Sequence, residues 1–158
     1  MTYPGSLSIR EVTWNGPDGD DVRHIRRRVF VEEQEYPEEC EWEDADADGA
    51  RHFLAFDKEG RAIAVARLVV VDGTPPAARI GRLAVLKERR GQGAGSAIME
   101  AAIARARELG FRRLVLSSQT HALNFYERLG FHATAPEHME VGHPHRWMER
   151  MLDTKGPE

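Results

Sequence analysis

The sequence predicts an α/β fold of the α+β kind, with a mixed but mostly antiparallel sheet of about six to seven strands flanked by helices. Short apolar segments recur along the 158 residues between clusters of Gly, Pro, Asn and Asp, which is typical of strands joined by turns. Segments with apolar residues every three or four positions stand between them and predict amphipathic helices. The length suits one domain, residues 1–158, that buries a sizeable core.

The N-terminal part is expected to contain a strand and a helix. Leu7–Val12 alternates apolar and polar residues, which predicts a strand. A helix capped by Asp20 or Asp21 then runs to about Glu33 and carries one apolar face. The arginines Arg26–Arg28 lie within this helix. We interpret them as a solvated face beside the acidic residues that follow, in preference to a nucleic-acid-binding patch.

An acidic segment follows the helix. Ten carboxylates and no lysine or arginine lie between Glu32 and Asp48, and Tyr36 and Trp42 are interspersed among them. Such a run is typically a solvated loop. It could also form an acidic rim that attracts a cationic amine and supplies a general base. The sequence leaves both interpretations open.

The middle of the chain predicts three antiparallel strands. Arg51–Phe56 and Ala62–Val71 are apolar runs on either side of Asp57–Gly60, which is a hairpin turn signal. Gly73–Pro76 makes the next turn. Ala78–Leu86 is the third strand, and it leads into a glycine-rich segment.

That segment predicts a tight loop from which a helix begins. Gly91, Gly93 and Gly95 alternate, so the backbone can turn sharply and approach a ligand closely. A helix over Ser96–Leu109, ended by Gly110, presents free N–H groups and a partial positive charge at its start. Together they predict an anion site suited to phosphate or pyrophosphate.

Two other phosphate-binding motifs fit this loop poorly. A P-loop requires a lysine followed by a hydroxyl residue after its last glycine, and this pair is missing here. A dinucleotide-binding fingerprint that starts at Gly91 would need a glycine where Ser96 stands. A nucleotide-binding module for ATP or NAD is therefore disfavoured.

The C-terminal part predicts a parallel strand, a short helix and two last strands. Arg112–Ser117 is a buried strand that lies parallel to the strand before the helix, because a helical crossover joins them. The short helix carries Tyr126 and ends at Gly130. Phe131–Ala135 and Arg146–Leu152 supply the last strands. The loop between them is rich in histidine and contains His138, His143 and His145.

Composition excludes several classes of protein. The net charge of −4 gives no general attraction to nucleic acid or to an anionic membrane. No apolar run approaches the ~20 residues that span a bilayer, and no signal peptide is expected. The single cysteine, Cys40, suits a cytoplasmic protein. No metal site is expected, because His143 and His145 lack the spacing of a helical pair and no cysteine stands nearby.

Two motifs resemble the GNAT superfamily of acetyl-CoA-dependent N-acyltransferases. Arg90, Gly93 and Gly95 fit its pyrophosphate-binding pattern Arg/Gln-x-x-Gly-x-Gly/Ala. The segment His121–Phe131 is similar to the one in which a short helix carrying a tyrosine ends in Gly-Phe. The resemblance covers about Leu68–Phe131, with the motifs in the order that the superfamily has them.

The preceding part of the chain resembles the ElaA- or YjcF-like branch of this superfamily. The residues that carry the resemblance are Arg28–Gln34, Pro37, Glu41, Asp44 and His52. In that branch a Gly-x-Pro-His segment precedes the last strand and lies near the acceptor side. His145 is therefore a candidate residue of the substrate pocket.

The resemblance implies direct attack of a primary amine on the thioester of acetyl-CoA, which serves as co-substrate without a metal. It also implies that Tyr126 lies near the sulfur. A tyrosine with a pKa of ~10 is protonated at pH 7, so Tyr126 is the candidate general acid, and a core tyrosine is the alternative. Backbone N–H groups near Leu83–Val85 could stabilise the carbonyl oxygen. The expected cofactor-binding residues are Leu83, Ala84, Val85, Arg90, Gly91, Gln92, Gly93, Ala94, Gly95, Ser96, Asn124 and Phe125.

The sequence does not single out the base or the acceptor. A protonated alkyl amine, with a pKa of ~10, has no lone pair, so the site must remove a proton. The candidate bases are Glu33, Glu41, Asp44, His52 and His145, and all except Asp44 are also expected substrate residues. The expected acceptor is a small-molecule or protein amine. The sequence leaves open whether the protein forms a homodimer. The alternative function is a non-catalytic acyl-CoA-binding sensor on the same fold.

Overall fold

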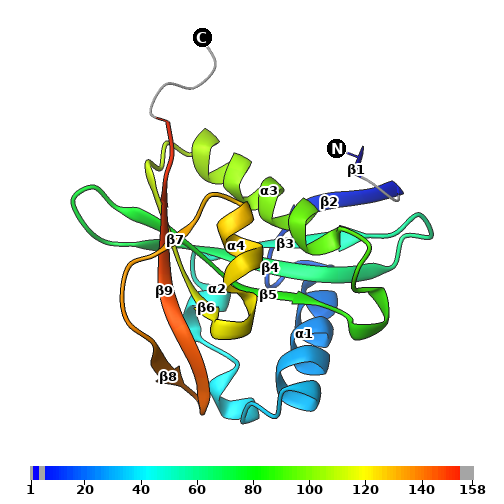
Figure 1. Ribbon diagram of the computed structural model, residues 1–158. Coiled ribbons are helices and arrows are strands. Elements are labelled where there is room, and N and C mark those ends of the chain that lie inside the picture. Colours follow the sequence, from blue (N-terminus) through cyan, green and yellow to red (C-terminus); the bar gives the residue numbers. More distant parts are fainter. Residues whose placement is uncertain (1, 4–5, 154–158) are drawn as a thin grey trace.

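The computed structural model describes residues 2–3 and 6–153 (Figure 1). Within them one sheet contains nine strands in the order β1-β2-β3-β4-β5-β6-β9-β7, and β8 pairs with β9. The pair β5 and β6 is parallel, and the other pairs are antiparallel. The expected mixed, mostly antiparallel α/β fold is thus confirmed. The three strands β1, β7 and β8 have only two or three residues each, so six longer strands form the body of the sheet.

The bounds of the elements are as follows. The strands are β1 (Thr2–Tyr3), β2 (Leu7–Val12), β3 (Arg51–Phe56), β4 (Ala62–Val71), β5 (Ala77–Val85), β6 (Arg113–Gln119), β7 (His132–Ala133), β8 (His138–Glu140) and β9 (His143–Met151). The helices are α1 (Gly19–Arg26), which continues as the π-helical η2 (Arg27–Glu33), then α2 (Asp44–Ala47), α3 (Ala94–Glu108) and α4 (Leu123–Arg128). Single turns of 3₁₀ helix form η3 (Glu38–Cys40), η4 (Lys87–Arg89) and η5 (Thr120–Ala122). Over the described ranges, no helix combines the length and apolar character needed to cross a membrane.

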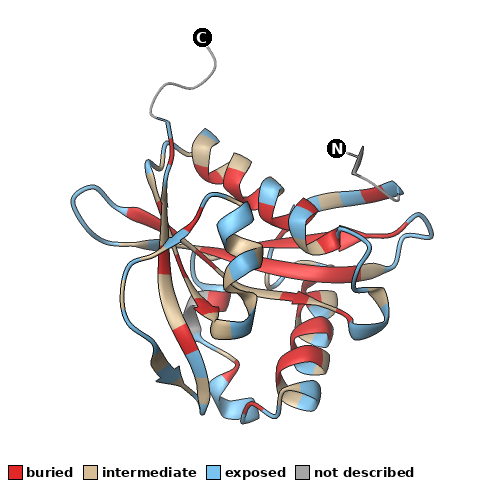
Figure 2. Cartoon of the chain, in the orientation of Figure 1, coloured by how far each residue is buried: buried red, intermediate tan, exposed pale blue. Residues whose placement is uncertain are grey.

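Helices cover both faces of the sheet. Figure 1 shows α3 and α4 on one face and α1 and α2 on the other. On the first face Ile98 of α3 belongs to the same buried cluster as Ala64 and Ala66 of β4, whereas Val65 belongs to the cluster of Ile25 on the opposite face. This alternation follows from the period of two in a strand and from burial on both sides. Figure 2 shows the resulting band of buried residues in the central strands.

The two central strands β5 and β6 separate along their length. Their pairing is confined to Ala77–Arg79 against Arg113–Val115, whereas β6 pairs with β9 from end to end. The register between β4 and β5 also shifts, because Val65 is opposite Ala84 but Arg67 is opposite Gly81. Arg82 lies in this irregularity with φ +50°, a backbone conformation rare for residues other than glycine. The bulge bends β5 away from β6, and a gap opens between them.

The beginning of the first helix differs from the expectation. The helix starts at Gly19 with Asp18 at the N-cap position, and Asp20 and Asp21 lie in its first turn. Arg26 is fully buried, so the expectation of a solvated arginine face is wrong for this residue. Arg27 and Arg28, by contrast, are 47% and 39% exposed and pair with carboxylates at the surface.

Arg26 belongs to a buried ionic cluster that holds the acidic segment in place. Its Nε donates to Glu41 Oε2 at 2.6 Å and its Nη1 to Asp46 Oδ1 at 2.7 Å, while Arg67 Nη1 donates to Asp46 Oδ1 at 2.9 Å. Burial alone raises the pKa of Asp46, but the hydrogen bonds and charges of these arginines outweigh it and hold the pKa at about 2. Glu41 and Asp46 therefore do not belong to a solvated loop, and arginines already neutralise them.

The histidine-rich segment is a hairpin, not a loop. His138 lies on β8, and His143 and His145 lie on β9. The last strand thus begins three residues before the expected Arg146. The strand expected over Phe131–Ala135 is reduced to the two residues of β7. Strand pairing decides these bounds, because backbone groups of the histidine segment complete the ladder between β8 and β9.

Candidate active site

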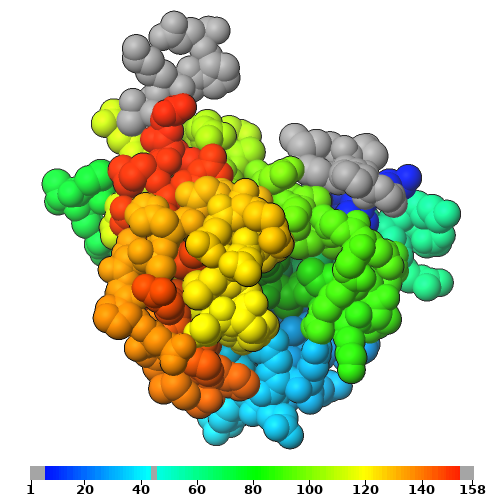
Figure 3. Space-filling model, viewed as in Figure 1, coloured from blue at the N-terminus to red at the C-terminus, as the bar shows by residue number. Residues whose placement is uncertain are grey.

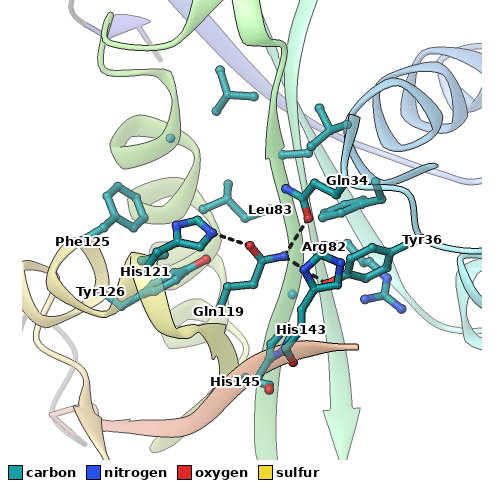
Figure 4. Close-up of a pocket in the computed structure, with 18 of the residues that line it drawn as sticks. Gln34, Tyr36, Arg82, Leu83, Gln119, His121, Phe125, Tyr126, His143 and His145 are labelled. Carbon is teal, nitrogen blue, oxygen red and sulfur yellow. Dashed lines mark hydrogen bonds between the residues drawn. The ribbon is translucent and has the colours of Figure 1, made fainter. Parts of the chain in front are cut away.

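A cavity of about 590 Å³ lies where β5 and β6 separate. Four parts of the chain line it: η2 with the residues that follow, β5 with the start of the glycine loop, the end of β6 with η5 and α4, and the start of β9. Figure 3 shows the surface hollowed where the yellow residues of α4 and the green residues of the glycine loop face each other. Figure 4 shows side chains from these elements pointing into the cavity.

Several expected cofactor residues lie at this cavity. Those that line it are Leu83, Ala84, Val85, Arg90, Gly95 and Phe125. Those outside its lining are Gly91, Gln92, Gly93, Ala94, Ser96 and Asn124, which lie in the glycine loop, at the start of α3 and on α4. The structure thus brings one part of the set together and places the rest on the adjoining loop and helices.

The glycine loop has the geometry of a close-approach site. Gly91 and Gly93 have φ of +80° and +84°, and a Cβ added at either would meet no atom within 4 Å. Glycine is therefore required by the backbone conformation, and the space beside it is open for a ligand. Gly93 is the N-cap of the 15-residue helix α3, so the first N–H groups of the helix point toward this space. These features fit a pyrophosphate group.

Arg90 is already paired in this structure. Its Nη1 and Nη2 donate to the two carboxylate oxygens of Glu33 at 2.6 and 2.7 Å, and its Nε donates to the Val85 carbonyl oxygen at 3.0 Å. The hydrogen bond from Arg90 holds the pKa of Glu33 below its ordinary value. Glu33, one of the predicted substrate residues, lines the cavity as an ionised carboxylate that is paired with an arginine.

Tyr126 lies on α4 and lines the cavity. Its ring packs edge-on against Phe125, with centroids 4.9 Å apart, and against Phe131 at 6.2 Å. Burial raises its pKa above the ordinary value, so the hydroxyl is protonated at neutral pH. No group in the described part of the chain forms a hydrogen bond with that hydroxyl. The Tyr126 ring thus packs against its aromatic neighbours, and the residue also lines the cavity with its hydroxyl protonated.

A polar network crosses the middle of the cavity (Figure 4). Gln119 Nε2 donates to Gln34 Oε1 at 2.7 Å and to the Tyr36 hydroxyl at 3.0 Å, and a hydrogen bond of 2.6 Å joins Gln119 Oε1 to His121 Nε2. The Tyr36 ring also packs against His143, with centroids 4.7 Å apart. The sequence did not predict Gln34, Tyr36, Gln119 or His121 as site residues. The polar residues at the end of the otherwise apolar β6 were the available signal.

Of the expected base and substrate residues, His145 lines the cavity, as Glu33 does. Glu41 and His52 lie outside its lining. His145 Nδ1 is 2.9 Å from the His143 carbonyl oxygen. A carbonyl oxygen only accepts, so Nδ1 carries the hydrogen and Nε2 is the basic nitrogen. His52 is fully buried behind the sheet, where its Nε2 meets the Asp46 carbonyl oxygen at 2.9 Å and burial lowers its pKa.

Two further expectations concern Asp44 and metals. The side chain of Asp44 lies outside the described residues. In the part of the chain that the structure describes, no group of three or more His, Cys, Asp or Glu could hold a metal ion.

Comparison with known proteins identifies the class of enzyme. The sequence profile of the acetyltransferase (GNAT) family matches residues 19–131. The chain therefore belongs to the GNAT family and is an acyltransferase that uses an acyl-CoA as co-substrate. The glycine loop at the start of α3 and the separated strands β5 and β6 are the parts of this chain that fit such a co-substrate.

Individual relatives confirm the branch. The uncharacterized N-acetyltransferase YjcF of Bacillus subtilis is 31% identical over 129 residues, which are 81% of this chain and 89% of YjcF. The protein ElaA of Escherichia coli is 30% identical over 131 residues, 80% of this chain and 82% of ElaA. The crystal structure of an acyl-CoA N-acyltransferase from Pseudomonas aeruginosa superposes with a TM-score of 0.77 at 30% identity, over 91% of this chain and 97% of that chain.

Proposed function

We propose that this protein transfers the acetyl group of acetyl-CoA directly to a primary amine of a small-molecule or protein acceptor. The observation that carries the proposal is the cavity between β5 and β6, which Arg90 and Gly95 of the glycine loop, the Leu83–Val85 segment and Tyr126 line together. A nucleophile can reach a thioester held on β5 from the β6 side of such a cavity. The proposal places the enzyme in the cytoplasm, in keeping with its single cysteine.

In the proposal, the glycine loop and α3 bind the pyrophosphate, and β5 holds the pantetheine arm. Open space beside Gly91 and Gly93, and the N-terminus of α3, support the first assignment. The absence of pairing between β5 and β6 beyond Arg79 supports the second, because that edge of β5 is left free for a ligand. The remaining proposed contacts are Leu83, Ala84, Val85, Arg90, Gln92, Ala94, Gly95, Ser96, Asn124 and Phe125.

Backbone and tyrosine groups have distinct proposed roles in the reaction. Acetyl-CoA supplies an activated acetyl carbonyl and a thiol leaving group. The N–H groups along Leu83–Val85, beside the bulge, donate hydrogen bonds to the carbonyl oxygen as it gains charge. Tyr126 donates its proton to the departing sulfur. Burial keeps the Tyr126 hydroxyl protonated at neutral pH, so its proton is present when the thiolate departs.

The test is a screen of diverse primary amines with acetyl-CoA, with free thiol release as the readout. We expect thiol release that depends on both the amine and the enzyme, with an acetylated amine as product. A protein that binds CoA tightly but releases no thiol with any amine would instead favour the acyl-CoA sensor. An enzyme that acetylates only hydroxyl groups would contradict the proposal.

A further inference from the structure

Three side chains that the proposed reaction does not yet use form a chain beside the cavity. Ser117 is on β6, and His138 and Glu140 are on β8. Residues paired across a sheet point to the same face. Ser117 pairs with Trp147, His138 with His145, and Glu140 with His143. Because the three partners alternate along β9, all of these side chains lie on one face. This is the face on which Ser117 and His145 line the cavity.

Hydrogen bonds connect these side chains through one carboxylate oxygen. Ser117 Oγ donates to Glu140 Oε2, and His138 Nε2 lies 2.5 Å from the same oxygen. The serine hydrogen is thus turned away from the cavity, which leaves the lone pairs of Oγ available on the cavity side. Glu140 and His138 are 31% and 32% exposed, so the chain begins at the cavity and ends in solvent.

The charges around Glu140 keep it ionised. Burial alone raises its pKa, but the hydrogen bonds from Ser117 and His138 and the charges of His145 and His138 outweigh that effect and lower it. Arg79, whose guanidinium lies 5.0 Å from the Trp147 ring centroid, adds positive charge near Glu140. Burial chiefly, and the charge of Glu140 in addition, raise the pKa of Tyr36. The carboxylate is therefore available as a proton acceptor at neutral pH.

We propose that Ser117 and Glu140 carry the proton that must leave the acceptor amine, with Ser117 as the catalytic contact and Glu140 as the terminal acceptor. The inference rests on the proposed function. An ammonium group loses two protons in becoming an amide. One of them replaces the proton that Tyr126 gives to the departing sulfur, so one proton must leave the site. The amine proton passes to Ser117 Oγ while the serine hydrogen passes to Glu140 Oε2. The nitrogen keeps the electron pair that forms the C–N bond, and Glu140 then releases its proton to water.

The other candidates in the cavity are less suited to this role. Glu33 is held by two hydrogen bonds from Arg90. His145 is only 6% exposed, so a proton taken up by its ring would leave a charge in a largely buried position. His138 positions the Glu140 carboxylate toward Ser117, because its Nε2 contacts the oxygen that accepts the serine hydrogen.

The size and pH dependence of the effect follow from the amine. An alkyl amine with a pKa of ~10 is neutral in only about one molecule in a thousand at pH 7. Without the route, the enzyme depends on that fraction, so we expect Glu140→Gln to lower kcat/KM by about 100-fold or more at pH 7. The deficit shrinks about tenfold for each pH unit as the pH rises toward the amine pKa. A purely structural role would give the same deficit at every pH.

The test measures thiol release from acetyl-CoA with two probes, 2-phenylethylamine, which is protonated at pH 7, and aniline, which is neutral. The variants are Glu140→Gln, Ser117→Ala and His145→Gln. The matched control is Glu137→Gln, an exposed carboxylate of the same segment that accepts only a hydrogen bond from Thr120. Thermal unfolding and acetyl-CoA affinity of each variant are measured in parallel.

We expect Glu140→Gln and Ser117→Ala to lose activity toward 2-phenylethylamine at pH 7, to recover as the pH rises, and to change little with aniline. The Glu137→Gln variant should match wild type throughout. Equal rates for Glu140→Gln and wild type at all pH values, or the pH-dependent loss in His145→Gln alone, would overturn the route while leaving the proposed function intact. A wild-type enzyme that releases no thiol with any amine would overturn both.

Discussion

Replacement of Arg26 by methionine tests the buried ionic cluster. Methionine keeps much of the length and volume of the side chain but removes the donors to Glu41 and Asp46. Both carboxylates have side chains at most 1% exposed, so they cannot turn to water for compensation. Arg67 would still bind Asp46, but Glu41 would keep only Arg82, whose Nε lies 3.5 Å from Glu41 Oε2.

The expected cost is large compared with that of a surface pair. Removing one partner of a buried ion pair typically costs about 3–5 kcal/mol, because the remaining charge stays buried and unpaired. For a domain of this size, each 1 kcal/mol lowers the unfolding temperature by about 2–4 °C, so we expect a decrease of roughly 6–20 °C. Arg27→Met is the matched control, since Arg27 is 47% exposed and its ion pair with Glu38 should contribute at most about 1 kcal/mol.

The assay is urea denaturation and thermal unfolding of the wild type and the two variants at pH 7. Comparable losses of unfolding free energy in Arg26→Met and Arg27→Met would refute the reasoning, because burial would then make no difference. A loss for Arg26→Met below about 1 kcal/mol would also refute it, since the cluster would behave as a surface ion pair.

Three other predictions follow from the same structure. The pKa of Asp46 falls from 3.8 in the unfolded chain to about 2, so the folded state gains about 2 kcal/mol of stability that is present above pH 3.8 and lost as the pH falls through 2. Asp46→Asn should flatten acid unfolding curves in that window, and unchanged curves would contradict this prediction. Gly93→Val should abolish acetyl-CoA binding in calorimetry, whereas Gly60→Val, at a similar φ of +81° in the β3–β4 turn, imposes the same backbone strain and should leave binding unchanged. Tyr126→Phe keeps the ring packing and should lower kcat by about 10²-fold, with little change in KM for acetyl-CoA; a kcat within a factor of two of wild type, with chemistry rate-limiting, would remove Tyr126 from the mechanism.

Local patterns in the sequence determined much of the fold. The alternation in Leu7–Val12 and the apolar runs Arg51–Phe56 and Ala62–Val71 predicted β2, β3 and β4 with their observed bounds. The helix after the glycine loop and the parallel strand β6 were also predicted. These features depend on side-chain periodicity and on turn residues within a short window, which a single sequence contains in full.

The sequence also determined the family and part of the candidate site. The pattern Arg90-x-x-Gly93-x-Gly95 and the tyrosine segment ending in Gly130 mark elements whose chemistry depends on local backbone geometry. Gly93 has the left-handed conformation that the loop requires. Motifs of this kind are visible without tertiary information, because the residues that act together are neighbours along the chain.

Only the tertiary structure decided which charged and polar side chains are buried, paired or aimed into the cavity. Arg26, Arg27 and Arg28 are adjacent and chemically identical, yet Arg26 alone meets carboxylates that lie 15 and 20 residues further on. His52 and His145 were equivalent candidates, and strand register placed one behind the sheet and the other at the cavity. The same register joined Ser117 to Glu140, 23 residues away. Such contacts depend on how distant strands pair, and a one-residue change of register would turn each side chain to the opposite face.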